Sequence, residues 1–199
     1  MNRLGLFCVI RRKRKQREQK DTSVKFLDLV QRDYNGENNQ IIATDVTYIP
    51  APRDCVNNFV FLSIAIDHRS KYIVNYNISK TNDLELVMKH MSKIKFNKKW
   101  IAHSDHGFQY SSKKYLESIQ NNNGVVSMAR IGNSLDNREV EYFFSILKSE
   151  CLKLIDVTKI NFSELKSIID NFILWYNNER IQSSLKWKTP QDFWGVCGQ

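Results

Sequence analysis

Three segments with strong β-strand character follow one another near the start of the chain and are joined by short connections. They cover residues 41–49, 57–66 and 71–77. The first is rich in β-branched and aromatic residues and is closed by Pro50 and Pro52. The segment Asp67–Ser70 predicts a turn between the second and the third. Strands joined this closely pair in antiparallel fashion, so the pattern predicts a three-stranded meander.

After the meander, helical and strand-like patterns alternate, and the last third of the chain is mostly helical. The predicted elements are a helix at 82–94, a strand at 99–103, a helix at 111–121 and a strand at 124–128. This is the order of an α/β sandwich of the RNase H type. Such a fold has a central mixed five-stranded sheet, with its first three strands antiparallel, flanking helices and further C-terminal helices. The order alone does not separate this fold from other α/β folds.

Two helix starts carry capping boxes in the C-terminal third. Asp136 with Glu139, and Asn161 with Glu164, have the spacing in which each side chain can bond to the backbone N–H of the other residue. The first helix has an apolar stripe at helical spacing, made of Val140, Phe143, Phe144, Leu147 and Cys151. The second has an apolar face made of Leu165, Ile168, Ile169, Phe172 and Tyr176. Trp175, Tyr176, Trp187 and Trp194 are expected to pack these C-terminal helices, with stacking on a base as the alternative for one of them.

Positive charge is concentrated at the N-terminus. The chain has a formal net charge of +9, and residues 1–20 contain eight basic side chains against one acidic side chain. We divide the chain into a basic arm, residues 1–35, and a core with a C-terminal helical extension, residues 36–199. The arm predicts salt-dependent contacts to nucleic-acid phosphates, with a solvated tail as the alternative. The residues expected to contact DNA are Arg11, Arg12, Lys13, Arg14 and Lys15.

Several classes of protein are disfavoured by composition. No apolar run approaches the roughly 18 residues that a membrane span needs, and no signal-peptide pattern precedes the basic run, so we expect a cytoplasmic protein without a membrane partner. The cysteines are scattered and lack metal-ligand spacing, which predicts free thiols and neither a zinc site nor a disulfide framework. They are Cys8, Cys55, Cys151 and Cys197.

Two aspartates occupy positions that suggest chemistry. Asp45 lies inside the first strand, where aspartate is depleted, although it could be a solvent-facing residue of an edge strand. Asp105 follows the short strand at 99–103, and α/β sheets place their chemistry at such strand ends. A turn before Gly107 is the alternative role for Asp105. His103 and His106 flank Asp105 and are expected to support it or the turn, because hard metal ions prefer oxygen ligands.

Glu141 is the third candidate. At about 100° per residue, Lys148 lies within about 20° of Glu141 on a helical wheel, beside the apolar stripe. The alternative is an ordinary solvated face. Three carboxylates brought together would repel one another unless a cation neutralised them. Mg²⁺ or Mn²⁺ fits such oxygen ligands, and two ions about 4 Å apart could serve phosphodiester chemistry.

At these residues the sequence resembles bacterial insertion-sequence transposases with a retroviral-integrase-like core. The matching segments are Thr44–Ile49, Ile66–Val74, His103–Gly107, Gln109–Tyr110, Ser127–Asn133, Asp136–Asn137, Glu141–Lys148 and Tyr176–Arg180, with Leu185 and Thr189–Pro190. The likeness covers most of residues 40–194 in the order of that family. Arg138 and Glu139 replace the small residues that the family has beside its third carboxylate.

The resemblance implies roles for individual residues. The three catalytic, metal-binding carboxylates of the family match Asp45, Asp105 and Glu141, with 35 residues between the last two, as in the D,D(35)E group. A basic residue seven positions after the glutamate matches Lys148, and Arg180 could add a further DNA contact. The implied activity is that of a Mg-dependent polynucleotidyl transferase with two Mg²⁺ or Mn²⁺ ions, which nicks element ends and joins strands through a freed 3′-hydroxyl.

The resemblance also implies partners. These are transposon-end and target DNA and further copies of the chain assembled on it, in the cytoplasm at the nucleoid. The segment Arg3–Leu6 and the basic arm resemble only the tail of the helix-turn-helix region that precedes the core in this family. A DNA-binding protein from an upstream reading frame is therefore a further expected partner. The alternatives are a catalytically unproductive DNA-binding remnant and a generic RNase H-like nuclease.

Overall fold

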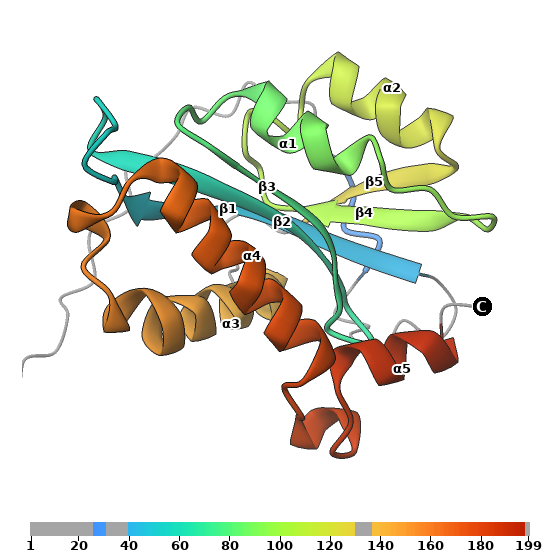
Figure 1. Ribbon diagram of the computed structural model, residues 1–199. Coiled ribbons are helices and arrows are strands. Elements are labelled where there is room, and N and C mark those ends of the chain that lie inside the picture. Colours follow the sequence, from blue (N-terminus) through green and yellow to red (C-terminus); the bar gives the residue numbers. More distant parts are fainter. Residues whose placement is uncertain (1–25, 31–39, 130–136, 198–199) are drawn as a thin grey trace, which may run out of the picture.

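The computed structural model describes residues 26–30, 40–129 and 137–197. The basic residues of the arm and the cap expected at Asp136 lie outside these ranges. A five-stranded sheet has helices on both faces (Figure 1). Its strands are β1 (Gln40–Pro50), β2 (Phe59–Asp67), β3 (Ile73–Ser79), β4 (Trp100–Ser104) and β5 (Gly124–Met128). The α-helices are α1 (Leu84–Met91), α2 (Lys113–Asn121), α3 (Arg138–Ile146), α4 (Phe162–Asn178) and α5 (Pro190–Cys197).

The sheet has the order β3-β2-β1-β4-β5. Strands β1, β2 and β3 are antiparallel, whereas β4 runs parallel to β1 and β5 parallel to β4. The predicted RNase H-like arrangement, with a mixed sheet and an N-terminal meander, is confirmed. Strand β3 begins later than predicted because Lys71 has a φ of 61° and belongs to the turn. Asp67 closes this turn, since its carboxylate accepts from the Ser70 backbone N–H at 2.8 Å.

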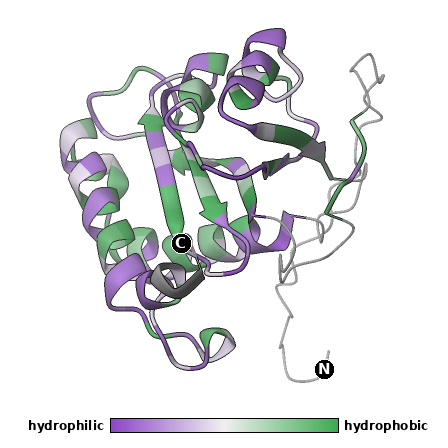
Figure 2. Cartoon of the chain, turned by 90° about the vertical axis from the view of Figure 1, so that its right-hand side faces the viewer, coloured by the Kyte–Doolittle hydropathy of each residue, from purple (hydrophilic) through white to green (hydrophobic). Residues whose placement is uncertain are grey.

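Apolar side chains on the two faces of the sheet build two core layers. On β1, Ala43 and Ile49 pack with α3 and α4, while Ile42 and Val46 pack with α1 and α2. Both faces of the central strands are therefore covered, which is why their sequences are nearly continuous apolar runs. Figure 2 shows hydrophobic residues gathered on the strands, with hydrophilic residues on much of the helical surface. Residues 26–30, which the predicted boundary places in the arm, pack beside β5, where Leu29 N donates to the Ser127 hydroxyl at 3.0 Å.

Helix α3 differs from the prediction at both ends. It begins at Arg138, and Asn137 occupies the N-cap position without a side-chain capping bond. Glu139, expected in a capping box, is buried and forms ion pairs instead. The helix continues as a π-helical turn (Leu147–Cys151) and a short 3₁₀ turn (Leu152–Leu154). The predicted apolar stripe is confirmed, since four of its five residues are buried and Cys151 packs against them.

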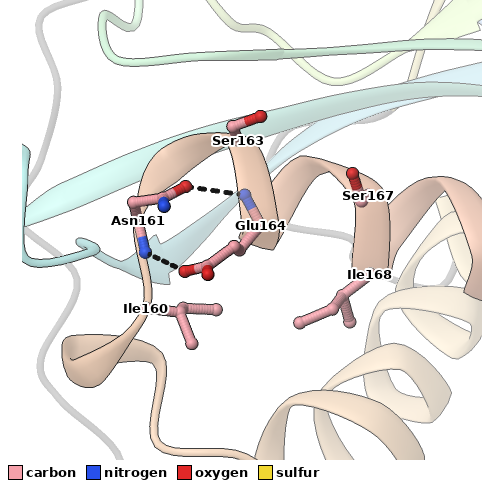
Figure 3. Close-up of a pocket in the computed structure, with 6 residues that line it drawn as sticks. All are labelled: Ile160, Asn161, Ser163, Glu164, Ser167 and Ile168. Carbon is pink, nitrogen blue, oxygen red and sulfur yellow. Dashed lines mark hydrogen bonds between the residues drawn. The ribbon is translucent and has the colours of Figure 1, made fainter.

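An asparagine side chain makes structural hydrogen bonds near each end of helix α4. At its start, Glu164 N donates to the Asn161 side chain at 2.9 Å and Asn161 N donates to the Glu164 carboxylate at 2.7 Å, which confirms the predicted capping box (Figure 3). Near its end, the buried Asn177 amide accepts from Ile73 N at 2.9 Å and donates to Ile73 O at 3.1 Å. Asn177 therefore fastens α4 to the start of β3.

The aromatic residues near the C-terminus divide into packed and exposed groups. Tyr176 is buried with its ring 4.9 Å from that of Phe143, and Trp194 stacks on Tyr72 with ring centroids 5.4 Å apart. Trp187 is 72% exposed, so the expectation that it packs the helices is wrong. It lies in a tight loop in which its own φ is 60°, and this backbone turns the ring outward from the core.

Within the described part of the chain, no helix has the length and apolar character needed to cross a membrane. Cys55 and Cys151 are free thiols, as predicted. The thiols of Cys8 and Cys197 lie outside the described side chains.

We expect Asn177→Leu to lower the free energy of unfolding by about 2–3 kcal/mol, because it removes two buried hydrogen bonds and leaves the Ile73 backbone groups without their partner. Urea unfolding measures the change. Asn178→Leu, one position along on the exposed side of α4, is the matched control and should change stability by less than about 0.5 kcal/mol. Equal effects of the two substitutions would contradict the anchoring role.

Candidate active site

The parallel pairing of β1 with β4 sets two aspartates side by side. The register pairs Ala43 with His103, and Asp45 and Asp105 each lie two residues beyond that pair. Asp45 lies within β1, and Asp105 is the first residue after the end of β4, so the two aspartates occupy matching places on neighbouring chain segments. The strand pairing itself ends at Ala43 and His103, so the carboxylates stand where the two strands begin to separate.

Helix α3 brings Glu141 to the same place. The side-chain amide of Asn137, at the start of the helix, donates to Thr44 O at 3.3 Å, beside Asp45 on β1. Glu141 follows one helical turn later, and α3 packs on β1 and β2. Partial burial raises the pKa of Glu141 above its usual range. The three predicted residues therefore come from the middle of β1, from the residue that follows β4 and from the helix that packs on β1 and β2.

The pKa of Asp45 is shifted in part by the charges of the other two carboxylates. Burial raises its pKa most, and the negative charges of Asp105 and Glu141 raise it further, to about 7. Two groups oppose the rise: the backbone N–H of Val46, which donates to the Asp45 carboxylate at 2.7 Å, and the positive charge of Lys148. The site therefore carries more negative charge than its own cations compensate.

Asp105 is held by its loop. Its carboxylate accepts from Gly107 N at 2.9 Å, which confirms the turn proposed as an alternative and combines it with the position next to Asp45. A Cβ atom on Gly107 would lie 3.0 Å from this same carboxylate oxygen and 3.1 Å from Tyr110. The loop can close over Tyr110 this tightly because residue 107 has no side chain. Tyr110 is buried behind the aspartates, and burial together with their charge raises its pKa.

Lys148 lies on the π-helical turn that follows α3 and is exposed. It lines an open groove of about 670 Å³ together with Lys153 and with residues from the end of β1. The remaining lining residues are Tyr48, Pro50, Leu152, Ile155, Asp156, Val157 and Thr158. The positive charge of Lys148 also acts on Asp45, whose pKa it lowers, so one of the two groove lysines interacts with the carboxylate site. Lys153 was not identified from the sequence, since one more lysine in a basic chain gives no signal.

A buried ion-pair cluster fixes the start of α3 and was not anticipated. Glu139 accepts from Lys71 at 2.8 Å and from Arg138 at 2.8 Å. Lys71 belongs to the turn between β2 and β3, so the pair ties this turn to the helix that carries Glu141. The available signal was the resemblance, which implies small residues beside the third carboxylate where this sequence has Arg138 and Glu139.

The other predicted residues have structural partners. His103 is buried, and its Nδ1 lies 3.0 Å from the Ser127 hydroxyl, as expected for a residue that supports the strand before Asp105. The guanidinium of Arg180 donates to both carboxylate oxygens of Glu150, and its Cζ lies 5.4 Å from the centroid of the Trp175 ring. The DNA contact predicted for Arg180 therefore has to be made by a guanidinium that already binds Glu150.

The donor chemistry of the site is suited to a hard cation, because the three facing groups are carboxylates with mutually unfavourable charge. In residues 26–30, 40–129 and 137–197, no three His, Cys, Asp or Glu side chains are close enough together to hold a metal ion.

A mixed sheet of this order, with helices on both faces, places the chain among the RNase H-like catalytic cores. Residues 35–134 and residues 125–190 both match the family described as integrase core domain. The chain belongs to this family and is an insertion-sequence transposase with an integrase-like core.

Two relatives and two solved structures illustrate the likeness. InsK of insertion sequence element IS150 from Escherichia coli (strain K12) is 32% identical over 97% of this chain and 68% of its own length. The transposase for insertion sequence element IS904 from Lactococcus lactis subsp. lactis (strain IL1403) is 31% identical over 78% of this chain and 61% of its own length. The magnesium complex of the HTLV-2 integrase catalytic core domain, in its trimeric form, aligns with a TM-score of 0.56 at 15% identity, covering 78% of this chain and 95% of that one. The simian T-cell lymphotropic virus intasome in complex with PP2A regulatory subunit B56 gamma aligns with a TM-score of 0.60 at 16% identity, covering 78% of this chain and 54% of that one.

We expect Asp45→Asn to stabilise the fold in alkaline but not in acidic solution. The folded-state pKa of about 7 lies above the ordinary aspartate value of 3.8, so the ionised carboxylate opposes folding as the pH rises through 7. In metal-free buffer the variant should gain about 2–4 kcal/mol at about pH 8, and this gain should vanish near pH 4. Urea unfolding at both pH values measures it. Glu85→Gln, on the exposed face of α1, is the control and should change stability by less than about 0.5 kcal/mol. A gain of the same size at both pH values would contradict the electrostatic cause.

Proposed function

We propose that this chain cuts and joins DNA strands, and that Asp45, Asp105 and Glu141 are its catalytic residues and hold two Mg²⁺ or Mn²⁺ ions. The observation that carries the proposal is that three carboxylates meet: Asp45 and Asp105 each lie two residues beyond the Ala43–His103 pair, and α3 packs on β1 with Glu141 in its first turn. Burial raises the pKa of Asp45 most, and the negative charges of Asp105 and Glu141 raise it further. Family membership supports polynucleotidyl transfer as the reaction class. The match along 97% of the chain to InsK favours a transposase over a decayed remnant.

A divalent cation fits the site because it would relieve the repulsion that the fold builds in. Carboxylate oxygens are the ligands that Mg²⁺ and Mn²⁺ prefer, and the structurally similar HTLV-2 integrase core was solved with magnesium. Bound metal ions would supply Lewis-acid stabilisation of the attacking and leaving oxygens of a phosphodiester. Asp45 must be deprotonated to act as a ligand, so metal affinity should fall between about pH 8 and pH 6.

The remaining residues of the site would bind and orient DNA. Lys148 and Lys153 line the groove beside the carboxylates, where they can contact the phosphates on either side of the scissile bond. Arg180 is a further candidate for a phosphate contact, made together with or in exchange for Glu150. The basic residues Arg11, Arg12, Lys13, Arg14 and Lys15 would add salt-dependent affinity.

The transposase would act as an oligomer, because pairing two DNA ends needs at least two active sites. The simian T-cell lymphotropic virus intasome is an assembly whose integrase resembles this fold. Its substrates would be transposon ends, which it would join to target DNA at the nucleoid. A DNA-binding protein from an upstream reading frame would recognise the sequence of those ends. A generic nuclease would instead cut without end preference and yield no strand-transfer products.

We expect Glu141→Gln to weaken Mn²⁺ binding sharply and to lower cleavage of a short duplex by at least about a hundredfold, since several kcal/mol of transition-state stabilisation would be lost. Calorimetric titration with Mn²⁺ and a gel assay for nicked strands measure the two effects. The matched control is Glu117→Gln, an exposed carboxylate on α2 across the sheet, which should leave both unchanged. Cleavage that survives in Glu141→Gln, or Mn²⁺ binding that is equal in both proteins, would contradict the proposed site.

A further inference from the structure

An exposed tryptophan between two lysines stands apart from the carboxylate site. Residues 182–188, here called the 182–188 hairpin, connect the end of α4 to α5 and project beyond both helices in Figure 1. Trp187 is 72% exposed at its tip, and Lys186 and Lys188 on either side are exposed as well. Burial in the core therefore does not account for the tryptophan.

The hairpin is rigid although it contains no regular strand. Gln182 and Lys188 form an isolated antiparallel bridge, with Gln182 N donating to Lys188 O at 3.1 Å. Trp187 N donates to Gln182 O at 3.0 Å, which closes the loop from the inside. Leu185 is 1% exposed and anchors the hairpin to the protein. The indole is thus presented on a fixed support, and little conformational entropy would be lost when it binds a partner.

The backbone at the tip is strained. Lys186 and Trp187 have φ values of 56° and 60°, so two consecutive residues with side chains adopt the left-handed conformation. This conformation is a genuine outlier for a bulky residue and costs of order 1 kcal/mol or more. Neither glycine nor asparagine, which suit it better, occupies position 187. Such strain at an exposed aromatic residue points to a function for the ring.

The surrounding charge identifies the kind of partner. No acidic residue occurs from Ile181 to Gln191, whereas two lysines flank the ring. Lysine is depleted in the cores of protein–protein interfaces, which argues against a second protein chain as the partner. Aromatic rings beside cations are the combination with which proteins bind single-stranded nucleic acid, through base stacking and phosphate contacts.

We propose that the 182–188 hairpin binds DNA, with Trp187 stacking on an unpaired base and Lys186 and Lys188 contacting the adjacent phosphates. This inference rests on the proposed function, because it assumes that the chain acts on DNA. The contact itself is separate from the three carboxylates. It assigns to the chain a second DNA contact that holds a frayed or single-stranded segment of the substrate. This contact requires no metal ion.

The test measures binding of a fluorescein-labelled single-stranded oligonucleotide by anisotropy, in buffer with EDTA. Trp187→Asn removes the ring and suits the left-handed backbone, so the variant should fold with equal or higher thermal stability. Its affinity should be about tenfold weaker, with an unchanged dependence on salt. The double variant Lys186→Gln/Lys188→Gln should instead reduce the slope of log K against log salt by about 1.4.

The matched control is Val56→Asn, which removes a fully exposed apolar side chain from the loop between β1 and β2, at the other end of the molecule. It should bind the oligonucleotide as the unaltered chain does. Equal affinities of Trp187→Asn and the unaltered chain would overturn the proposal, as would a chain that binds no oligonucleotide. A change in oligomeric state by light scattering, without a change in DNA affinity, would overturn it in favour of an interface between copies.

Failure of the proposed function gives a different result. If the unaltered chain binds the oligonucleotide through Trp187 but cleaves no DNA with Mg²⁺ or Mn²⁺, the catalytic assignment is wrong and the hairpin contact stands. If cleavage occurs and Trp187→Asn binds normally, the hairpin assignment is wrong and the catalytic one stands.

Discussion

The separation of β1 from β4 is the feature on which the candidate site depends. The two strands are parallel and paired through Ala43 and His103, and Asp45 and Asp105 each lie two residues beyond this pair. Beyond this point β1 continues along β2 alone, as far as Pro50. In the described part of the chain, β4 therefore leaves this edge of β1 beyond Ala43, where Asp45 lies. The sheet topology thus creates the acidic pair.

Helix α3 completes the site only because its start is fixed on both sides. The Asn137 amide holds it to Thr44 on β1, and the buried Glu139 carboxylate holds it to Lys71 in the turn between β2 and β3. Removing one partner from a buried ion pair leaves an uncompensated charge, so this pair specifies one position for the helix.

The sequence predicted the fold, which the structure confirms, and it singled out three carboxylates whose catalytic role stays a prediction; both inferences used local signals. Periodic apolar residues marked the strands, and an aspartate inside β1 contradicted its surroundings strongly enough to be noticed. Long-range contacts leave no such signal. The Asn177 hydrogen bonds to Ile73 join residues 104 positions apart. The ion pair of Lys71 with Glu139 joins the turn between β2 and β3 to the first turn of helix α3. The expected Asp136–Glu139 capping box involves a residue outside the described ranges, and the local pattern could not show that Glu139 is buried and pairs with Lys71.

Asp45 and Trp187 each oppose stability, and both lie at sites proposed to meet DNA. At Asp45 the cost is electrostatic, since burial and two neighbouring carboxylates oppose its ionisation. At Trp187 the cost is conformational, since a bulky residue adopts a left-handed backbone. Left-handed backbone also occurs at Lys71, Asn123 and Lys186, so this conformation alone does not mark a site. Asp45 and Trp187 differ in that a ligand can act on each. A cation would relieve the repulsion at Asp45, and a stacked base would use the ring that Trp187 holds in solvent.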